Sequence, residues 1–222
     1  MRTLEPELRQ GLVALGLTLD DAQVQRLLDY LELIQKWTKV YNLTAVRDPA
    51  EMLTHHLLDS LAVIRPLQQQ LAQLVPAGEE ASAVRLLDVG SGAGLPGIVI
   101  AICCPGITVH CVDTVAKKAA FIQQVAVSLK LPNLRGLHAR VESLTEPYAV
   151  VSSRAFASLV DFTNWSGAAL AEDGIWMAMK GKQPADELAA LPAGVEVFHV
   201  EQLLVPGLDA ERCIVWMRKR AA

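Results

Sequence analysis

Between residues 84 and 139, short apolar segments alternate with longer amphipathic ones, and no other feature of the 222-residue chain constrains its fold as strongly. The pattern predicts strands at 84–89, 107–112 and 134–139, with helices at 96–104 and 115–131 between them. Such alternation is typical of a parallel sheet with helices on both faces, joined by right-handed crossovers. Four further strands are predicted at 150–152, 174–179, 195–202 and 213–218.

The expected fold class is therefore α/β, a doubly wound, seven-stranded and mostly parallel sheet. The last two predicted strands follow each other without a strong helical pattern between them, which favours an antiparallel hairpin at one edge of the sheet.

The first third of the chain predicts an N-terminal helical extension. Apolar residues at three- and four-residue spacing predict a helix from about 20 to 41, with Thr18 as its cap. Asp48, followed by Pro49, predicts a second helix that continues through Ile64. Residues 76–83 lose this periodicity and are rich in turn formers. We therefore expect a helical cap at 1–75, a linker at 76–83 and the main domain at 84–222.

Composition excludes several classes of protein. A formal net charge of −4 argues against a protein that holds nucleic acid by bulk charge, although residues 81–145 are locally basic. Hydrophobic residues make up 52% of the chain, too many for a disordered protein, and no apolar run is long enough to span a membrane. The four cysteines lack C-x-x-C spacing, so free buried thiols are expected. With no export signal, we expect a cytoplasmic location.

A glycine-rich loop follows the first predicted strand. It runs from Asp88 through Gly97 as DVGSGAGLPG, where the chain must turn tightly into a helix. Glycines allow close approach of a ligand to the backbone, and a helix N-terminus offers free N–H groups. Asp113 ends the next strand, where a carboxylate can accept the hydroxyls of a ribose. The combination predicts a nucleotide-type cofactor at the carboxyl ends of the strands.

Two cofactors remain open at this point. The spacing Gly92-x-Gly94-x-x-Gly97 matches the dinucleotide fingerprint, which would imply an NAD-dependent oxidoreductase. The acidic residue that precedes the glycines resembles instead the first motif of S-adenosylmethionine-dependent methyltransferases, and so does the terminal hairpin.

An ordered set of motifs then resembles one family over nearly the whole chain, from about residue 20 to 220. The motifs are Trp37-x-x-x-Tyr41-Asn42-Leu43-Thr44, His56-x-x-Asp59-Ser60, the loop from Asp88 to Gly97, Ser153-Arg154-Ala155, Lys180-Gly181 and Glu211-Arg212. In that order they resemble the small-subunit ribosomal RNA guanine-N(7) methyltransferases, the glucose-inhibited division protein B family. One departure is Tyr148-Ala149, where that family's pattern has an acidic residue, so the start of the fourth strand is in doubt.

The resemblance implies a class I, Rossmann-like fold and methyl transfer from S-adenosylmethionine to ring nitrogen 7 of one guanine in small-subunit ribosomal RNA. It implies that Gly90, Leu95, Val141, Glu142 and Arg154 line the cofactor site. Together with the glycine loop, the expected cofactor-binding residues are Asp88, Gly90, Gly92, Gly94, Leu95, Asp113, Val141, Glu142 and Arg154.

The expected chemistry requires positioning rather than proton removal. Nitrogen 7 of guanine has an in-plane lone pair and no proton, so no general base is expected, and Arg154 and Lys180 are the candidates for positioning. No metal site is expected. Candidate RNA contacts are Asn42, His56, Arg140, Lys182 and Arg212.

The expected partner is small-subunit ribosomal RNA, in a ribosomal particle, with the chain acting as a monomer and not at a membrane. A non-catalytic RNA-binding assembly protein with the same fold remains an alternative.

Overall fold

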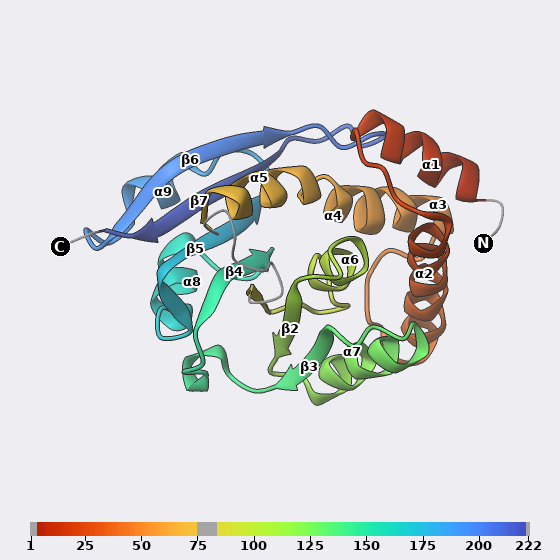
Figure 1. The fold of residues 1–222 in the computed structure, drawn as a ribbon, viewed down its shortest axis with the longest axis horizontal. Coiled ribbons are helices and arrows are strands. Elements are labelled where there is room, and N and C mark those ends of the chain that lie inside the picture. The colour runs from red at the N-terminus through yellow and green to blue at the C-terminus, as the bar shows by residue number, and fades with distance from the viewer. Residues whose placement is uncertain (1–3, 75–83, 221–222) are drawn as a thin grey trace.

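The computed structural model describes residues 4–74 and 84–220 and contains one seven-stranded sheet (Figure 1). The strand order is β3-β2-β1-β4-β5-β7-β6, with β1 to β5 mutually parallel and β7 antiparallel to both of its neighbours. The strands are β1 Arg85–Val89, β2 Thr108–Asp113, β3 Leu134–His138, β4 Tyr148–Arg154, β5 Leu170–Lys180, β6 Val195–Leu203 and β7 Arg212–Lys219. The predicted doubly wound sheet and its terminal antiparallel hairpin are therefore confirmed.

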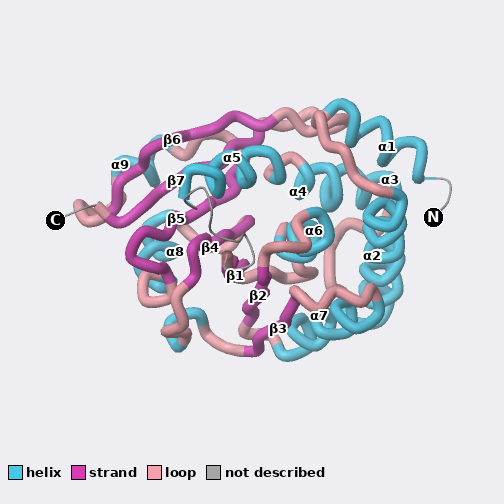
Figure 2. The backbone as a smooth tube through the Cα atoms, viewed as in Figure 1, coloured by secondary structure: helices cyan, strands magenta, loops and turns pink. Residues whose placement is uncertain are grey.

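Helices cover both faces of this sheet. They are α1 Glu5–Ala14, α2 Asp21–Tyr41, α3 Pro49–Met52, η2 Leu53–Leu58, α4 Asp59–Leu61, α5 Ile64–Leu74, α6 Gly97–Cys103, α7 Ala116–Ser128, η4 Val141–Ser143, α8 Leu159–Ser166 and α9 Ala185–Ala189. In Figure 2 the helices α1, α2, α6 and α7 lie on one side of the view, and α8 and α9 lie on the other. The sequence patterns did not predict α1, α8 or α9.

The long helix α2 begins through a capping box. The carboxylate of Asp20 accepts a hydrogen bond from the Gln23 backbone N–H at 2.7 Å, and the Gln23 side chain accepts one from the Asp20 N–H at 3.1 Å. The prediction that Thr18 caps this helix is wrong, because the helix starts at Asp21 and Thr18 lies two residues before the cap position. The predicted helix from about 20 to 41 is confirmed.

The second helical region is less regular than the sequence predicts. Asp48 caps it as expected, since its carboxylate accepts from the backbone N–H groups of Ala50 and Glu51. The single predicted helix is instead α3, a π-helical segment η2 and the short α4, followed after two turn residues by α5. Wider π-type turns are uncommon and occur frequently at functional sites. This segment positions His56 and Asp59.

The N-terminal helices pack directly on the sheet domain. Tyr30 is fully buried, and its hydroxyl donates a hydrogen bond to the carbonyl of Ala93 at 2.6 Å. Trp37 contacts Phe121 of α7 edge to face, with ring centroids 5.2 Å apart. Apolar side chains of α1, α2 and α5 belong to the same buried cluster as those of α6 and α7. The predicted linker at 76–83 lies outside the described residues.

Two strands begin two or more residues earlier than predicted. β4 starts at Tyr148, which is 1% exposed and bonds through its hydroxyl to His110 Nδ1 at 2.8 Å. The absence of an acid at this position therefore does not shorten the strand. β5 starts at Leu170, four residues before the predicted start, with a register shift against β4 that follows Tyr148.

None of the helices in the described part of the chain has the length and apolarity needed to cross a membrane. All four cysteines are buried free thiols.

Candidate functional site

Three glycines shape the loop after β1. Gly90, Gly92 and Gly94 have φ angles of +65°, +58° and +85°, a region that side chains with a Cβ rarely adopt. A Cβ at Gly90 would lie 2.1 Å from the Phe156 ring, so this glycine also allows an aromatic side chain to lie close over the loop. A Cβ at Gly94 would lie 2.3 Å from Ile98. The loop therefore needs glycine both for its backbone angles and for packing.

Asp88 fixes the end of the loop through buried hydrogen bonds. It is completely buried, accepting from the Gly97 backbone N–H at 3.0 Å and from the Ser152 hydroxyl at 2.8 Å. Loss of solvent raises the pKa of this carboxyl to about 6, and the two hydrogen bonds oppose the rise. Asp88 thus connects the start of α6 to β4.

Asp113 holds the same loop from the end of β2. One carboxylate oxygen accepts from the Gly92 N–H at 3.0 Å, and the other accepts from the Val115 N–H at 2.9 Å. Lys118 Nζ lies 3.6 Å from the first of these oxygens. Each carboxylate oxygen keeps a further acceptor position, so Asp113 can shape the loop and still accept a hydroxyl from a ligand.

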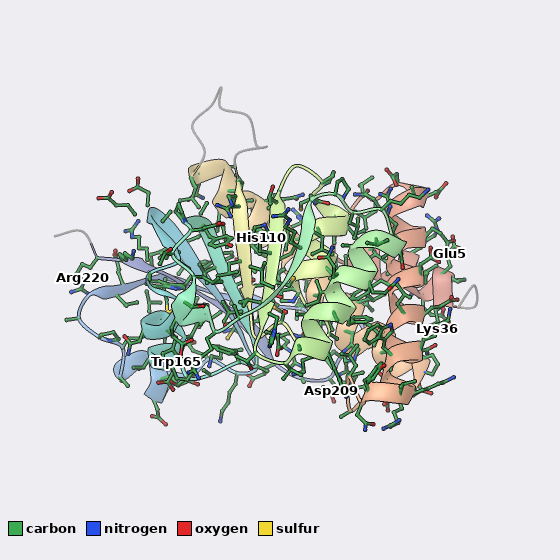
Figure 3. The ribbon with its side chains drawn as sticks, turned by 90° about the horizontal axis from the view of Figure 1, so that it is seen from below. Glu5, Lys36, His110, Trp165, Asp209 and Arg220 are labelled. Carbon is green, nitrogen blue, oxygen red and sulfur yellow. The ribbon has the colours of Figure 1, made fainter. Side chains whose placement is uncertain are left out.

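A cavity of about 370 Å³ opens beside these residues at the carboxyl ends of the strands. Its floor is apolar at Val112 and Val141, and Asp113 supplies a buried carboxylate. Its lining residues are Val89, Gly90, Val112, Asp113, Thr114, Val115, Lys118, Ala139, Arg140, Val141, Glu142, Ala155, Phe156 and Trp165. We call this the first cavity. Phe156 contacts Trp165 edge to face with centroids 5.8 Å apart, and Figure 3 shows Trp165 at the opposite side of the molecule from Lys36 on α2.

A second cavity of about 420 Å³ lies next to the first. It is lined by His55, His56, Asp59, Arg154, Ala155, Met179, Lys180, Gly181 and Arg212. Ala155, which has a φ of +49° directly after β4, lines both cavities. The two cavities therefore meet at the end of the central strand.

A buried carboxylate organises the second cavity. Asp59 is 3% exposed and accepts from Arg154 Nη1 at one oxygen and from Arg212 Nε at the other, both at 2.8 Å. Arg154 also donates to the carbonyl of His55 at 3.1 Å. Charge-assisted hydrogen bonds of this kind fix both guanidinium groups in place.

Lys180 and His56 complete the polar lining. Lys180 donates to the Ala157 carbonyl at 3.0 Å and to Glu187 at 2.8 Å. His56 is 6% exposed, with Nε2 2.9 Å from the Thr44 hydroxyl and no hydrogen-bond partner for Nδ1 within the described residues. Burial, with the positive charge of Arg154, lowers the pKa of His56 to about 4, so the ring is neutral at pH 7.

The structure groups the predicted site residues unevenly. The first cavity brings together Gly90, Asp113, Val141 and Glu142, and also Arg140, which pairs with Glu142 at 2.9 Å. The second brings together His56, Arg154, Lys180 and Arg212. Neither lining includes Asp88, Gly92, Gly94, Leu95, Asn42 or Lys182.

Of the six residues outside the linings, four belong to the glycine loop and two, Asn42 and Lys182, are exposed on the surface. Asp88, Gly92 and Gly94 shape the loop itself, and Leu95 is 4% exposed within the apolar core. Asn42 ends α2 in a left-handed conformation and accepts from Arg47 at 2.8 Å. Lys182 is exposed just beyond β5.

Several lining residues had no expected role. Asp59 belongs to the His56-x-x-Asp59 motif, but only the ion pairs with two distant arginines give it a function. Phe156 lies two residues after β4, and an aromatic residue just past a strand that ends at the site is the signal that would have found it; Trp165 lies on α8 and has no such signal. Within residues 4–74 and 84–220, no cluster of three His, Cys, Asp or Glu side chains is arranged to hold a metal.

Comparison with known proteins gives a consistent result. Residues 23–215 match the GidB family, described as rRNA small subunit methyltransferase G. The chain is 72% identical to the ribosomal RNA small subunit methyltransferase G of Albidiferax ferrireducens, with 100% of both chains covered. It is 70% identical to the protein of the same name from a Polaromonas species, over 100% of this chain and 96% of that one.

Solved structures with a similar fold are more distant in sequence. TrmN from Thermus thermophilus gives a TM-score of 0.52 at 20% identity, covering 76% of this chain and 53% of that chain. A SAM-dependent methyltransferase from Aquifex aeolicus gives a TM-score of 0.52 at 15% identity, covering 77% and 97%. These two likenesses establish the fold, since identity this low carries no finer conclusion.

Proposed function

Because the chain belongs to the rRNA small subunit methyltransferase G family, we propose that it transfers a methyl group from S-adenosylmethionine to ring nitrogen 7 of one guanine in small-subunit ribosomal RNA. The observation that carries this proposal is the pair of adjoining cavities that meet at Ala155. One has the glycine loop and a buried carboxylate, and the other has arginine and lysine side chains. A transfer between two bound molecules needs two such sites in contact.

The first cavity fits S-adenosylmethionine. Asp113 keeps free acceptor positions for the ribose hydroxyls, and Val141 and Val112 offer an apolar surface for the adenine. Gly90 also lines the cavity, and the absence of its Cβ lets the Phe156 ring lie close over the loop, where the ring adds a further apolar surface. When bound, the cofactor supplies an electrophilic methyl group on a sulfonium sulfur.

The chain's own residues position the acceptor base and remove no proton before transfer. Guanine nitrogen 7 carries a lone pair and no hydrogen, so a general base has nothing to accept at that atom. Arg154 is fixed by Asp59 and by the His55 carbonyl, and Lys180 is fixed by Glu187 and the Ala157 carbonyl. Preorganised donors of this kind orient a base without cost at the moment of reaction.

The family match argues against the NAD-dependent oxidoreductase that the glycine spacing left open. It supports ribosomal RNA as the substrate. We propose further that the protein acts as a monomer in the cytoplasm, on RNA that is already part of a ribosomal particle. The negative net charge supports a structured cognate target over free RNA, because non-specific affinity rises with the number of phosphates neutralised. Four buried free thiols fit a reducing compartment.

Mass spectrometry of nuclease-digested small-subunit RNA tests the proposal. Purified RNA, partly assembled subunits and mature subunits are incubated with the enzyme and S-adenosylmethionine, and 7-methylguanosine is quantified. We expect new 7-methylguanosine in at least one of these substrates, and most in the particles. If none of the three gains the modification, the chain is better explained as a non-catalytic assembly protein.

A further inference from the structure

The second cavity contains one carboxylate among several cations, and this arrangement points to a particular base. Asp59 is the acidic side chain of the lining, and Arg154, Lys180 and Arg212 are its cations. Both Asp59 oxygens already accept a guanidinium N–H, yet each keeps an acceptor position. A ligand for this cavity therefore needs hydrogen-bond acceptors for the cations and donors for the carboxylate.

Guanine presents this combination on neighbouring positions of one ring system. Its O6 and N7 atoms are acceptors, whereas N1–H and the 2-amino group are donors. Adenine places an amino donor where guanine has O6, which would face the cations. The neutral His56 ring also lines the cavity.

On the basis of the proposed function, we propose that the second cavity binds the target guanine. Asp59 then determines the choice of base by accepting hydrogen bonds from N1–H and the 2-amino group. The cations Arg154, Lys180 and Arg212 then face O6, which leaves the lone pair of N7 free to point toward the first cavity. The site joins the first cavity at Ala155, so a base held here lies beside the cofactor site.

The Asp59 contact agrees with the direction of charge movement, whereas the cations of the same cavity oppose it. Methylation at nitrogen 7 moves the positive charge from the sulfonium to the purine, which makes N1–H a stronger donor. A carboxylate on that edge interacts more strongly with the methylated ring than with the unmodified one. Contacts that strengthen during the reaction raise its rate as well as its selectivity.

The ion pairs with Arg154 and Arg212 give Asp59 a structural role as well, so its test needs a readout that a structural role alone would not move. We choose the ratio of methylation rates on two RNAs, one with guanine at the target position and one with inosine. Inosine keeps N1–H, O6 and N7 but lacks the 2-amino group. Dimethyl sulfate methylation of the same two RNAs gives the intrinsic difference in nitrogen 7 reactivity, which is divided out.

We expect the unmodified enzyme to prefer guanine over inosine by about tenfold or more after this correction, since one hydrogen bond to a charged acceptor is lost. The variant Asp59→Asn should be slower on both RNAs, and its guanine preference should fall to about threefold or less. The control Asp173→Asn, an exposed carboxylate on β5, should keep the full preference.

Three outcomes overturn the inference. Equal corrected rates of the unmodified enzyme on both RNAs would mean that the cavity does not read the 2-amino group, as expected if it held a backbone phosphate. This measurement needs no variant, so it applies even if Asp59→Asn fails to fold. If Asp59→Asn methylates both RNAs more slowly by the same factor, so that its preference for guanine is unchanged, the carboxylate only holds the arginines in place. A loss of preference in Asp173→Asn equal to that in Asp59→Asn would remove the link to the cavity. Failure of the unmodified enzyme on guanine RNA would count against the proposed function instead.

Discussion

Asp113 serves the loop and the first cavity with the same two oxygens. Its carboxylate accepts from Gly92 and Val115 and also faces the space assigned to the cofactor. Replacing Asp113 with Ala should therefore weaken S-adenosylmethionine binding by about 10- to 100-fold, because a hydrogen bond to a charged group is lost. Calorimetric titration measures this. Unchanged affinity would show that the ribose hydroxyls bind elsewhere.

The same substitution should lower stability, which separates the two roles of the residue. The Gly92 and Val115 N–H groups lose their acceptor, so the free energy of unfolding without cofactor should fall by about 1 to 3 kcal/mol. Asp113→Asn is the matched variant, since its single amide oxygen can keep one of the two bonds. If it binds the cofactor as weakly as Asp113→Ala yet is more stable, the ligand contact is distinct from the loop contact.

His56 and Asp88 should give stability opposite dependences on pH. The folded state holds the pKa of His56 near 4, against 6.5 for a free side chain, so the unfolded state binds more protons between these values. Its contribution to stability therefore falls as the pH is lowered from 6.5 to 4. The pKa of Asp88 is raised to about 6 from 3.8, so the folded state binds more protons there, and its contribution rises as the pH is lowered.

Single variants separate these two contributions. Relative to the unmodified protein, His56→Gln should lose about 2 kcal/mol less stability between pH 7 and pH 4.5. Asp88→Asn should lose more stability than the unmodified protein over the same pH range. Urea unfolding at a series of pH values measures both differences. Parallel stability curves for His56→Gln and the unmodified protein would contradict a buried neutral imidazole.

At the scale of elements, the two candidate caps of α2 offer a direct comparison. Asp20→Ala removes the acceptor for the Gln23 N–H and should lower the free energy of unfolding by about 1 kcal/mol. Thr18→Ala, at the position that the sequence pattern favours, should change it by less than about 0.5 kcal/mol. Urea unfolding at pH 7 measures both variants. A larger loss for Thr18→Ala would mean that the helix starts earlier.

The elements that sequence patterns predict well are those with buried, periodic apolar residues. β1 and β2 are almost entirely buried, and α6 is apolar throughout, so composition alone marks them. The helix α9 has no buried residue, and α1 has a weak apolar pattern that is completed by packing against α2 and η2. The π-helical turn of η2 has no known sequence signal, and it decides where His56 and Asp59 lie.

The site residues likewise divide into those that a local sequence pattern indicates and those that only the folded chain brings together. The glycine loop and Asp113 are local in sequence, and their spacing is enough to indicate a nucleotide-type cofactor. The second cavity depends on ion pairs that join Asp59 to residues 95 and 153 positions away. No local pattern encodes such a pairing, because it arises only when the N-terminal helices pack on the sheet.

At the scale of the whole molecule, most of the lysine and arginine side chains among the predicted site residues are paired with carboxylates within the protein. Arg154 and Arg212 share Asp59, Lys180 pairs with Glu187, and Arg140 pairs with Glu142. Such cations orient a ligand, but they add little net positive potential to a chain with a formal charge of −4. RNA binding should therefore depend on shape and on specific contacts more than on bulk charge.

The salt dependence of RNA binding follows from this distribution of charge. We expect the logarithm of the binding constant to fall with the logarithm of salt concentration at a slope no steeper than about −3, as for a few phosphate contacts. Lys182 is exposed and has no carboxylate partner within the described residues, so Lys182→Ala should reduce the slope by about one. Filter binding or fluorescence anisotropy from about 50 to 200 mM salt measures both values. A slope near −6 would mean that RNA follows a basic surface, such as the locally basic segment 81–145, and that the net charge of the chain does not govern its affinity.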